Sequence, residues 1–424
     1  MPTQYKNEQN KKNKKMSELY KLPAGWKWKK LESISLITSG YAFKSTDFNQ
    51  NDGIKSIKIT NVGVKEFVRD SYFLPIGLAE KLSKFRVLSG DIVIALTRPY
   101  ISNGLKIATV PIDYDKAFLN QRVASIRSMI NKSINAYVYY YLSTNNILKE
   151  VKELSRTLNQ PNLSVKELSL FKIPLPPLAE QKRIVAKLDS LFEKIDKAIE
   201  LHQQNITNAN TLMASTLDKT FKKLEGEYSI KTLNDACEKI TDGTHSSPKA
   251  TNVGYPYITV KDIDENGRID FDNCLSINQD DFFKLKSGNC APAKNDVLFS
   301  KDGTVGKVSV VDFEKDFVVL SSLAILRPNK DMNSYYLFYV MKSPNFFDFA
   351  QSKKTGAAIK RVVLRTIKEF EIPLPPLPIQ QQTVEYLDSI ATKVDKIKQL
   401  NEQKLENLKA LKASILDKAF RGEL

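Results

Sequence analysis

The sequence predicts an α+β protein built by tandem duplication. Two globular mixed α/β domains are separated by two long helices that pair as an antiparallel coiled coil with pseudo-twofold symmetry. Three observations predict this fold: a repeat at a fixed offset, two long helical stretches with regularly spaced apolar residues, and short apolar runs upstream of each stretch. The function must therefore use two similar parts that differ in detail.

The repeat is clearest in IPLPPLAEQKRIVAKLD, which starts at Ile173 and returns from Ile372 as IPLPPLPIQQQTVEYLD. The offset of 199 residues holds without a gap to residue 424, and 24 of the 53 paired positions are identical. This repeat predicts five parts: a flexible basic tail (1–21), a first globular domain (22–172), a first helical region (173–225), a second globular domain (226–371) and a second helical region (372–424).

The two globular segments are alike only in landmarks. GIKSIKITNV (53–62) resembles GYPYITVKDI (254–263) as a short alternating strand. SGDIVIAL (89–96) resembles KNDVLFSK (294–301) as a buried strand entered through an acidic turn. The sequence therefore predicts matching strands in two diverged copies of one domain.

Residues 178–224 and 377–421 are predicted to be helices, since after their opening turns they contain neither glycine nor proline. Apolar residues recur at spacings of three and four, which predicts a coiled-coil seam. The seam residues are Val185, Leu188, Phe192, Ile195, Ile199, Ile206 and Ala209 in the first helix, and Leu387, Ile390, Val394, Ile397, Leu408, Leu411 and Ile415 in the second. The alternative is two separate amphipathic helices, each packed on its own domain.

Each seam is interrupted by polar residues at the same internal position, His202 and Asn205 in the first and Asn401 and Lys404 in the second. A polar layer near the helix midpoints would fix the register of the pair at some cost in stability. The alternative is that His202 is a catalytic base or a metal ligand.

The composition favours a polyanionic partner. Lys and Arg exceed Asp and Glu by 64 to 48, a formal charge of +16, although nine Lys against two Glu in residues 1–30 supply seven of these charges. The alternative is an ordinary solvated surface. No apolar stretch is long enough for a membrane span, and neither a secretory signal nor a disulfide framework is evident, so a cytoplasmic protein is expected.

No catalytic motif is evident. The nearest approach to a phosphate loop, SKDGTVGK (300–307), lacks the four-residue gap between its glycines and the Lys-Ser/Thr ending of a Walker loop. The three cysteines have no metal-binding spacing, and the chain has only two histidines. We expect no catalytic residue, no metal site and no cofactor in this chain.

LPAGWKWKKLESISLITSG (22–40), LNDACEKITDGTHSSP (233–248) and the two IPLPPL repeats resemble the specificity subunit of type I restriction-modification systems. The resemblance implies two target recognition domains that read a bipartite, asymmetric site on double-stranded DNA. It also implies that the chain is no enzyme itself but directs two adenine-N6 methyltransferase subunits and two restriction subunits. S-adenosylmethionine, ATP and Mg²⁺ would belong to those partners.

Two other functions stay open. One is a coiled-coil scaffold that joins proteins without touching DNA. The other is a nuclease, or another enzyme, with an unrecognised site.

Candidate DNA contacts are polar, basic or aromatic residues in predicted loops, because such side chains reach phosphates and base edges. They are Tyr41, Lys44, Arg98, Tyr100, Asn103, Gln121, Arg122, His245, Ser247, Lys249, Lys301, Lys353, Lys354, Lys360 and Arg361. Candidate docking residues for partner subunits are identical in both helix starts, because two identical partners require a repeated surface. They are Leu178, Gln181, Leu188, Asp189, Leu377, Gln380, Leu387 and Asp388.

Overall fold

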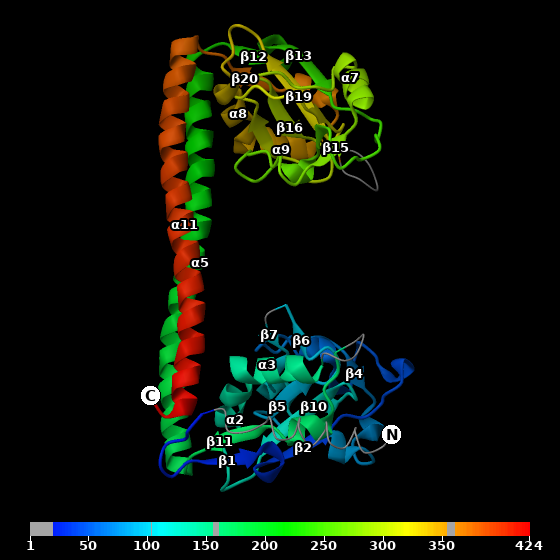
Figure 1. Ribbon diagram of the computed structural model, residues 1–424, viewed down its shortest axis with the longest axis vertical. Helices are drawn as coiled ribbons and strands as arrows, with labels where there is room; N and C mark the ends of the chain where they lie inside the picture. Colours follow the sequence, from blue (N-terminus) through cyan, green and yellow to red (C-terminus); the bar gives the residue numbers. More distant parts are fainter. Residues whose placement is uncertain (1–19, 103, 156–160, 354–360) are drawn as a thin grey trace. The chain divides into compact units, whose positions relative to one another are not determined.

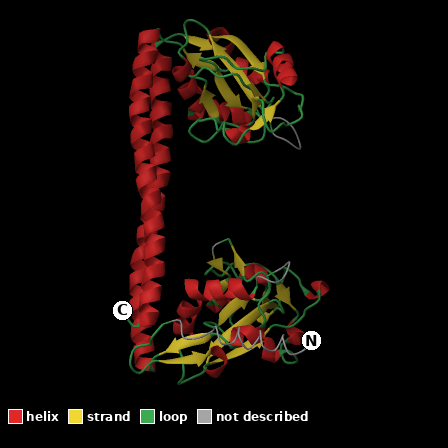
Figure 2. Cartoon of the chain, viewed as in Figure 1, coloured by secondary structure: helices red, strands yellow, loops and turns green. Residues whose placement is uncertain are grey.

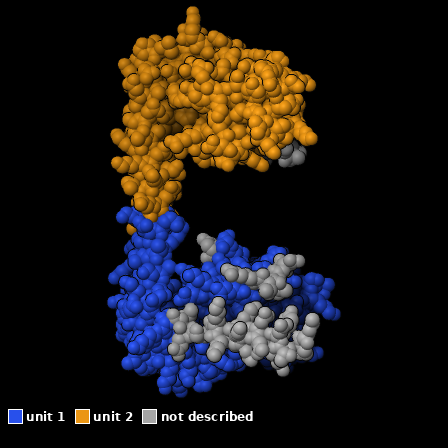
Figure 3. Space-filling view, in the orientation of Figure 1, with its two compact units in different colours: residues 1–200, 404–424 blue, residues 201–403 orange. Residues whose placement is uncertain are grey.

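The computed structural model describes residues 20–102, 104–155, 161–353 and 361–424. The chain forms two compact units, shown in blue and orange in Figure 3. The first unit contains residues 1–200 and 404–424, and the second contains residues 201–403. Each unit therefore combines one globular domain with part of each long helix.

The globular domain of the first unit is built on a four-stranded antiparallel sheet. Its order is β2 (Ser35–Ser39), β10 (Val123–Ser128), β5 (Ile92–Ala95) and β8 (Ile107–Thr109). All four residues of β5 are buried, because its alternate side chains enter two different apolar cores. The continuous apolar run of the predicted strand is explained by this burial on both faces.

Smaller elements complete this domain, as Figures 1 and 2 show. β3 (Ile54–Ile57) lies between β4 (Phe73–Leu74) and β9 (Phe118–Leu119), and β6 (Tyr100–Ile101) pairs with β7 (Gly104–Leu105). The helices are α2 (Asn135–Leu142), α3 (Asn145–Leu154) and α4 (Val165–Ser169). β1 (Lys27–Lys30) pairs with β11 (Lys172–Leu175), which leads into the first long helix.

The second unit repeats this plan. Its four-stranded sheet has the order β13 (Cys237–Asp242), β19 (Leu323–Pro328), β16 (Val297–Ser300) and β17 (Val308–Val310). β14 (Tyr255–Ile258) lies between β15 (Leu275–Ile277) and β18 (Val318–Val319), and β12 (Ile230–Thr232) pairs with β20 (Glu371–Pro373). Its helices are α6 (Leu233–Ala236), α7 (Gln279–Ser287), α8 (Ser334–Lys342), α9 (Pro344–Ser352) and α10 (Leu364–Lys368). The predicted strand matches 53–62 with 254–263 and 89–96 with 294–301 are confirmed, as β3 with β14 and β5 with β16.

The acidic turn before each buried strand has the same structural role in both domains. Asp91 is 1% exposed, and its carboxylate accepts a hydrogen bond from Nε of Arg127 at 2.7 Å. Asp296 is also 1% exposed, and its carboxylate accepts a hydrogen bond from Nε of Arg327 at 2.9 Å. In each case the arginine lies on the neighbouring strand. The ion pair therefore joins two strands of the sheet, and a buried carboxylate requires such a partner.

The two long helices are α5 (Leu178–Glu227) and α11 (Leu377–Arg421), which begin where the sequence predicts. α5 continues through Gly226 to Glu227. The strands β11 and β20 include Ile173 and Ile372, so each globular domain extends further along the chain than the predicted boundaries at 172 and 371.

The helices pair antiparallel within each unit. In the first unit the Lys412 ammonium lies 2.6 Å from the Asp196 carboxylate, and Arg183 donates to the carbonyl oxygen of Leu424 at 2.7 Å. In the second unit Nδ1 of His202 lies 2.7 Å from Oδ1 of Asn401. The predicted polar layer is confirmed for these two residues. The predicted pseudo-twofold relation concerns the placement of one unit against the other and stays a prediction.

Two predicted seam positions are wrong. Ile397 is 39% exposed and Leu411 is 46% exposed, whereas most of the other predicted seam residues are buried or half-buried. Spacing alone could not exclude them, because each helix also packs on a globular domain and its buried stripe turns accordingly.

Candidate nucleic-acid interface

In the first domain the candidate residues gather at one end of the four-stranded sheet. Tyr41 follows β2, and Gln121 and Arg122 lie in the turn that enters β10. The backbone N–H of Gln121 donates to the Tyr41 carbonyl oxygen at 2.9 Å, which fixes the two segments side by side. All three side chains are exposed, with Tyr41 at 40%. This end of the sheet therefore presents an aromatic, an amide and a guanidinium group.

Two further candidates lie in the segment after β5. Arg98 is exposed, has a φ of 46°, and donates its amide to the Pro161 carbonyl oxygen at 2.8 Å. Tyr100 is half-buried in the β6–β7 hairpin, with the Lys152 ammonium 5.5 Å from its ring centre. Lys44 is exposed before a short turn of helix at residues 45–47. Asn103 lies outside the described residues.

In the second domain, His245 and Arg361 lie at the equivalent end of the sheet, beside Asp242 and Asp302. His245, Ser247 and Lys249 are exposed in the loop after β13. Nε2 of His245 lies 3.4 Å from the Asp242 carboxylate. Lys353 is exposed at the end of α9 and Arg361 is exposed in the segment before α10, while Lys354 and Lys360 lie outside the described residues.

Lys301 does not fit its predicted role as a phosphate contact. Its side chain is 6% exposed, and its ammonium lies 3.3 Å from Oδ1 of Asp242 and 3.2 Å from Oδ2 of Asp302. A phosphate contact requires an exposed charge, so Lys301 instead holds two neighbouring carboxylates in place. The sequence could not predict this burial, because Asp242 is far from Lys301 along the chain.

The two sheet ends share one backbone arrangement, which we call the sheet-end frame. It comprises residues 39–41, 96–97, 120–123 and 162 in the first domain, and 242–244, 301–302, 320–323 and 361 in the second. Three pairs of equivalent hydrogen bonds define it. In the first pair, Leu96 N donates to Arg122 O and Lys301 N donates to Ser322 O, both at 2.9 Å. In the second, Gln121 N donates to Tyr41 O at 2.9 Å and Ser321 N donates to Thr244 O at 2.8 Å. In the third, Gly40 N donates to Val123 O at 3.1 Å and Gly243 N donates to Leu323 O at 3.0 Å.

Glycine is required at the head of the frame in both domains. A Cβ at Gly40 would lie 2.2 Å from the Asn120 carbonyl oxygen, and one at Gly243 would lie 2.3 Å from the Val319 carbonyl oxygen. In each domain two backbone segments approach so closely that only glycine fits between them.

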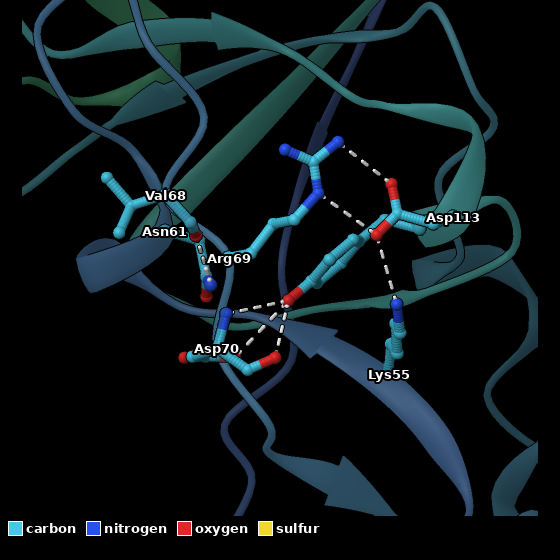
Figure 4. Close-up of polar contacts among 7 residues, drawn as sticks. Lys55, Asn61, Val68, Arg69, Asp70 and Asp113 are labelled. Carbon is cyan, nitrogen blue, oxygen red and sulfur yellow. Dashed lines mark hydrogen bonds and ion pairs between the residues drawn. The ribbon is translucent and has the colours of Figure 1, made fainter.

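A polar cluster that the sequence did not indicate lies beside β3 in the first domain (Figure 4). Arg69 donates to both carboxylate oxygens of Asp113, each at 3.2 Å, and Lys55 donates to the same carboxylate at 3.1 Å. The hydrogen bond from Arg69 is the main reason that the pKa of Asp113 lies below its usual range. Tyr114 donates to the Asp70 carbonyl oxygen at 2.8 Å. These contacts tie the segment after β3 to residues 112–114, and no local sequence pattern signals them.

The docking prediction is contradicted for four of its eight residues. Gln181, Leu188, Gln380 and Leu387 are each 0% exposed. A surface that receives another subunit must be accessible, so these residues cannot form one. Leu178 is half-buried, and Leu377 is 44% exposed.

The buried glutamines bind the globular domain to the start of each helix. Oε1 of Gln181 accepts a hydrogen bond from the backbone N–H of Ile134 at 3.1 Å. Its Nε2 donates to the carbonyl oxygens of Lys132 and Pro176 at 3.2 and 2.9 Å. Gln380 makes the equivalent bonds to Asn333 N, Asp331 O and Pro375 O, at 2.8, 2.7 and 2.8 Å. We call each set the glutamine contact. It recurs because both domains use it internally.

The repeated aspartates belong to the same internal junction. Asp189 accepts a hydrogen bond from the Tyr140 hydroxyl, and Asp388 accepts one from the Tyr339 hydroxyl at 2.5 Å. Both aspartates keep an exposed side, so they can still border a surface for partners.

Exposed leucines, rather than the helix starts, form a repeated apolar surface. Leu201 and Leu212 on α5 are 52% and 50% exposed. Their counterparts 199 residues later, Leu400 and Leu411 on α11, are 50% and 46% exposed. Three helical turns separate the two leucines of a pair, so both lie on one face of their helix. We call these positions the leucine pairs.

In the described part of the chain, no group of three or more His, Cys, Asp or Glu side chains is arranged to hold a metal ion. None of the helices described combines the length and apolar character that crossing a membrane requires.

The fold and its two sheet ends define a class: proteins with a duplicated domain, in which the two copies present different side chains on the same backbone frame. The family model described as the type I restriction modification DNA specificity domain matches residues 23–209 and 225–409. The chain therefore belongs to this family and contains its domain twice. Each matched segment includes a globular domain and part of the helix that follows it.

Curated relatives and solved structures agree with this assignment. The specificity subunit of the type I restriction enzyme EcoBI of Escherichia coli is 26% identical over 422 residues, which cover 93% of this chain and 85% of the relative. The MjaVIII specificity subunit of Methanocaldococcus jannaschii is 34% identical over 227 residues, 53% of this chain and 51% of the relative.

Two solved structures share the fold. A chain from a study of complex assembly and conformational transition of the type I R-M system has a TM-score of 0.76 at 26% identity, covering 96% of this chain and all of that one. The HsdS subunit from Thermoanaerobacter tengcongensis has a TM-score of 0.55 at 25% identity, covering 96% and 99%.

Proposed function

We propose that the chain reads a bipartite, asymmetric DNA site, one half-site per globular domain, and directs adenine-N6 methylation and restriction by partner subunits to that site. The observation that carries this proposal is the sheet-end frame, which occurs twice with the same backbone and different exposed side chains. Two different surfaces on one frame suit two different short sequences. Membership of the specificity-domain family supports the same function.

The charge of the chain suits a double-stranded DNA partner. The formal charge of +16 favours contact with phosphates, and exposed cationic side chains such as Arg98, Arg122 and Arg361 lie at the sheet ends. Phosphate contacts would position the domains, and base contacts would specify the sequence.

In this proposal the chemistry belongs to partners: two methyltransferase subunits with S-adenosylmethionine, and two restriction subunits with ATP and Mg²⁺. The leucine pairs are the surfaces that we assign to the two methyltransferase copies. Identical partners need a repeated surface, and Leu212 and Leu411 are the same residue type at the same repeat position with similar exposure.

DNA binding and methylation by the chain together with its methyltransferase test the proposal. Duplex DNA containing the mapped site should bind more weakly as salt rises, with a linear decrease of log K against log salt, because phosphate contacts release counterions. Mapping of N6-methyladenine should give a motif of two short sequences separated by an unspecified spacer. Sequence-independent methylation, or no DNA binding at low salt, would favour the scaffold function.

Docking is tested separately. Leu212→Glu and Leu411→Glu should each reduce the complex from two methyltransferase subunits to one, as measured by light scattering after size-exclusion chromatography. Thr211→Glu, an exposed change beside Leu212, is the matched control and should leave two subunits bound. Loss of both copies in a single leucine variant would contradict the assignment of one leucine pair to each partner.

A further inference from the structure

The sheet-end frame keeps its backbone in both domains while its side chains change in kind. Leu163 N donates to Leu96 O at 2.8 Å, and Val362 N donates to Lys301 O at 2.9 Å, so the frame closes in the same way in both copies. Isolated β-bridges pair Thr97 with Asn162, and Asp302 with Arg361. Five matched positions therefore carry Ser39, Leu96, Thr97, Arg122 and Asn162 in the first domain, and Asp242, Lys301, Asp302, Ser322 and Arg361 in the second.

These changes differ from those at the helix junction. There the glutamine contact and the tyrosine–aspartate hydrogen bond recur with the same residue types. At each of the five matched frame positions, one domain has a charged residue and the other has an uncharged one. A duplicated domain that recognises two different ligands must differ where it touches them. At the frame the backbone hydrogen bonds are the same in both domains, whereas the side chains differ in charge.

In the second domain the frame contains a buried ion triad. The Lys301 ammonium lies between the carboxylates of Asp242 and Asp302, at 3.3 and 3.2 Å. The side chain of each aspartate is 22% exposed, so each retains an accessible part, whereas Lys301 is buried. Oδ1 of Asp242, Oδ1 of Asp302 and Oγ of Ser322 are shielded from solvent and accept no hydrogen bond from the described residues, although Oδ1 of Asp242 has its ionic contact with Lys301. A base would therefore meet the exposed part of each aspartate rather than these atoms.

Acceptors of this kind have one suitable partner on duplex DNA. Carboxylates repel phosphates, so two of them at the DNA-facing end of a basic protein are favourable only if they meet hydrogen-bond donors. In the major groove the donors are the exocyclic amino groups, N4 of cytosine and N6 of adenine. Lys301 compensates the charge of both carboxylates and fixes their positions.

We propose that the sheet-end frame is the base-reading site of each domain. In the second domain, Asp242 and Asp302 accept hydrogen bonds from a cytosine or adenine amino group, and Lys301 is a positioning residue. In the first domain, the exposed guanidinium of Arg122, at the frame position matched to Ser322, reads a guanine edge instead. This inference rests on the proposed function, since it names the residues that read the DNA.

The test uses the full chain with its methyltransferase and maps the methylated motif. Asp302→Asn replaces an acceptor by an amide of the same shape. It should reduce discrimination at one base pair of the second domain's half-site by about 5- to 150-fold and leave the other half-site unchanged. Arg122→Gln, which changes the residue that we assign to base reading in the first domain, should change only the other half-site. Asp280→Asn, an exposed change on α7, is the control that removes the same charge without touching the frame.

Lys301 needs a readout that a merely structural residue would not alter. Lys301→Met should relax the second half-site in the same way as Asp302→Asn, and Lys301→Arg should restore part of the discrimination. The melting midpoint of each variant is measured beside its motif. If Lys301→Met fails to fold, Asp302→Asn and Arg122→Gln still decide the question.

Two results would overturn the inference: an unchanged motif in both Asp302→Asn and Arg122→Gln, or an equal loss of methylation at all sequences. Failure of the proposed function would look different, because the wild-type complex itself would then lack a sequence motif.

Discussion

Replacing Gln181 by leucine should destabilise the first unit without abolishing the site for a partner subunit. The side chain of Gln181 is completely buried and makes three hydrogen bonds, to Ile134, Lys132 and Pro176. A buried hydrogen bond contributes about 0.5–1.5 kcal/mol, so three contribute about 1.5–4.5 kcal/mol. Leucine has a similar volume, so most of the loss comes from polar groups left without partners. We expect a decrease of about 2–4 kcal/mol in the free energy of unfolding.

The chain offers a selective probe for this measurement. Its only two tryptophans, Trp26 and Trp28, both lie in the first globular domain. Tryptophan fluorescence during urea unfolding should therefore report the first unit, while circular dichroism reports both. Gln181→Leu should move the fluorescence transition to lower urea. Gln380→Leu should leave the fluorescence transition in place and change only the circular dichroism curve.

Gln382→Leu is the matched control, because Gln382 is exposed on the same helix as Gln380. It should change the free energy of unfolding by less than about 0.5 kcal/mol. The reasoning fails if Gln181→Leu unfolds as the wild type does but no longer binds the methyltransferase in size-exclusion chromatography. Gln181 would then be a docking residue, as the repeat alone suggested.

Three further predictions follow from other contacts. Burial, with Glu153 acting in the same direction, raises the pKa of Glu150 from 4.5 to about 7, so the folded state holds its proton more tightly and stability falls as pH rises through this range. Glu150→Gln should therefore stabilise the chain by about 1–3 kcal/mol at pH 8.5 and have little effect at pH 4, in urea titrations. Arg127→Met should cost about 3–5 kcal/mol by the same assay, because it leaves the buried Asp91 carboxylate unpaired. Exchanging residues 22–172 for those of a relative should change one half of the methylated motif, and a change in both halves would refute one domain per half-site.

The sequence was sufficient for the architecture because the duplication is visible without any structure. The constant offset of 199 residues located both helices, and α5 and α11 begin at the predicted Leu178 and Leu377. The apolar runs located the two buried strands. These features depend on spacing along the chain, which the sequence records directly.

The burial of particular side chains depends on contacts between distant segments, and here the sequence was insufficient. Identity between Gln181 and Gln380 by itself suggests a shared partner surface, but a repeated internal contact preserves the same residues. Leu411 has seam spacing but lies on an exposed face. Lys301 lies in a polar segment that the sequence predicts to be an exposed loop. Its burial depends on its ion pair with Asp242, which is distant along the chain.

The two kinds of contact also differ in how freely they can change. At the helix junction each residue satisfies several buried polar groups, so most substitutions cost stability. At the sheet end the exposed residues, such as Arg122 and Arg361, contribute little to folding, because surface substitutions usually change stability by about 0.5 kcal/mol or less. The junction can therefore hold the backbone frame while exposed side chains on it vary.

The Lys301 triad is the exception within the frame. Removing either Asp242 or Asp302 would leave a buried ammonium with one partner, and removing Lys301 would leave two carboxylates facing one another. Single substitutions in the triad are thus costly, whereas exchanging all three for the first domain's Ser39, Leu96 and Thr97 removes every charge together. The triple exchange should therefore be less destabilising than Lys301→Met alone. This non-additivity is measurable by urea unfolding of the single and triple variants, and additive changes in the free energy of unfolding would refute the coupling of the three residues.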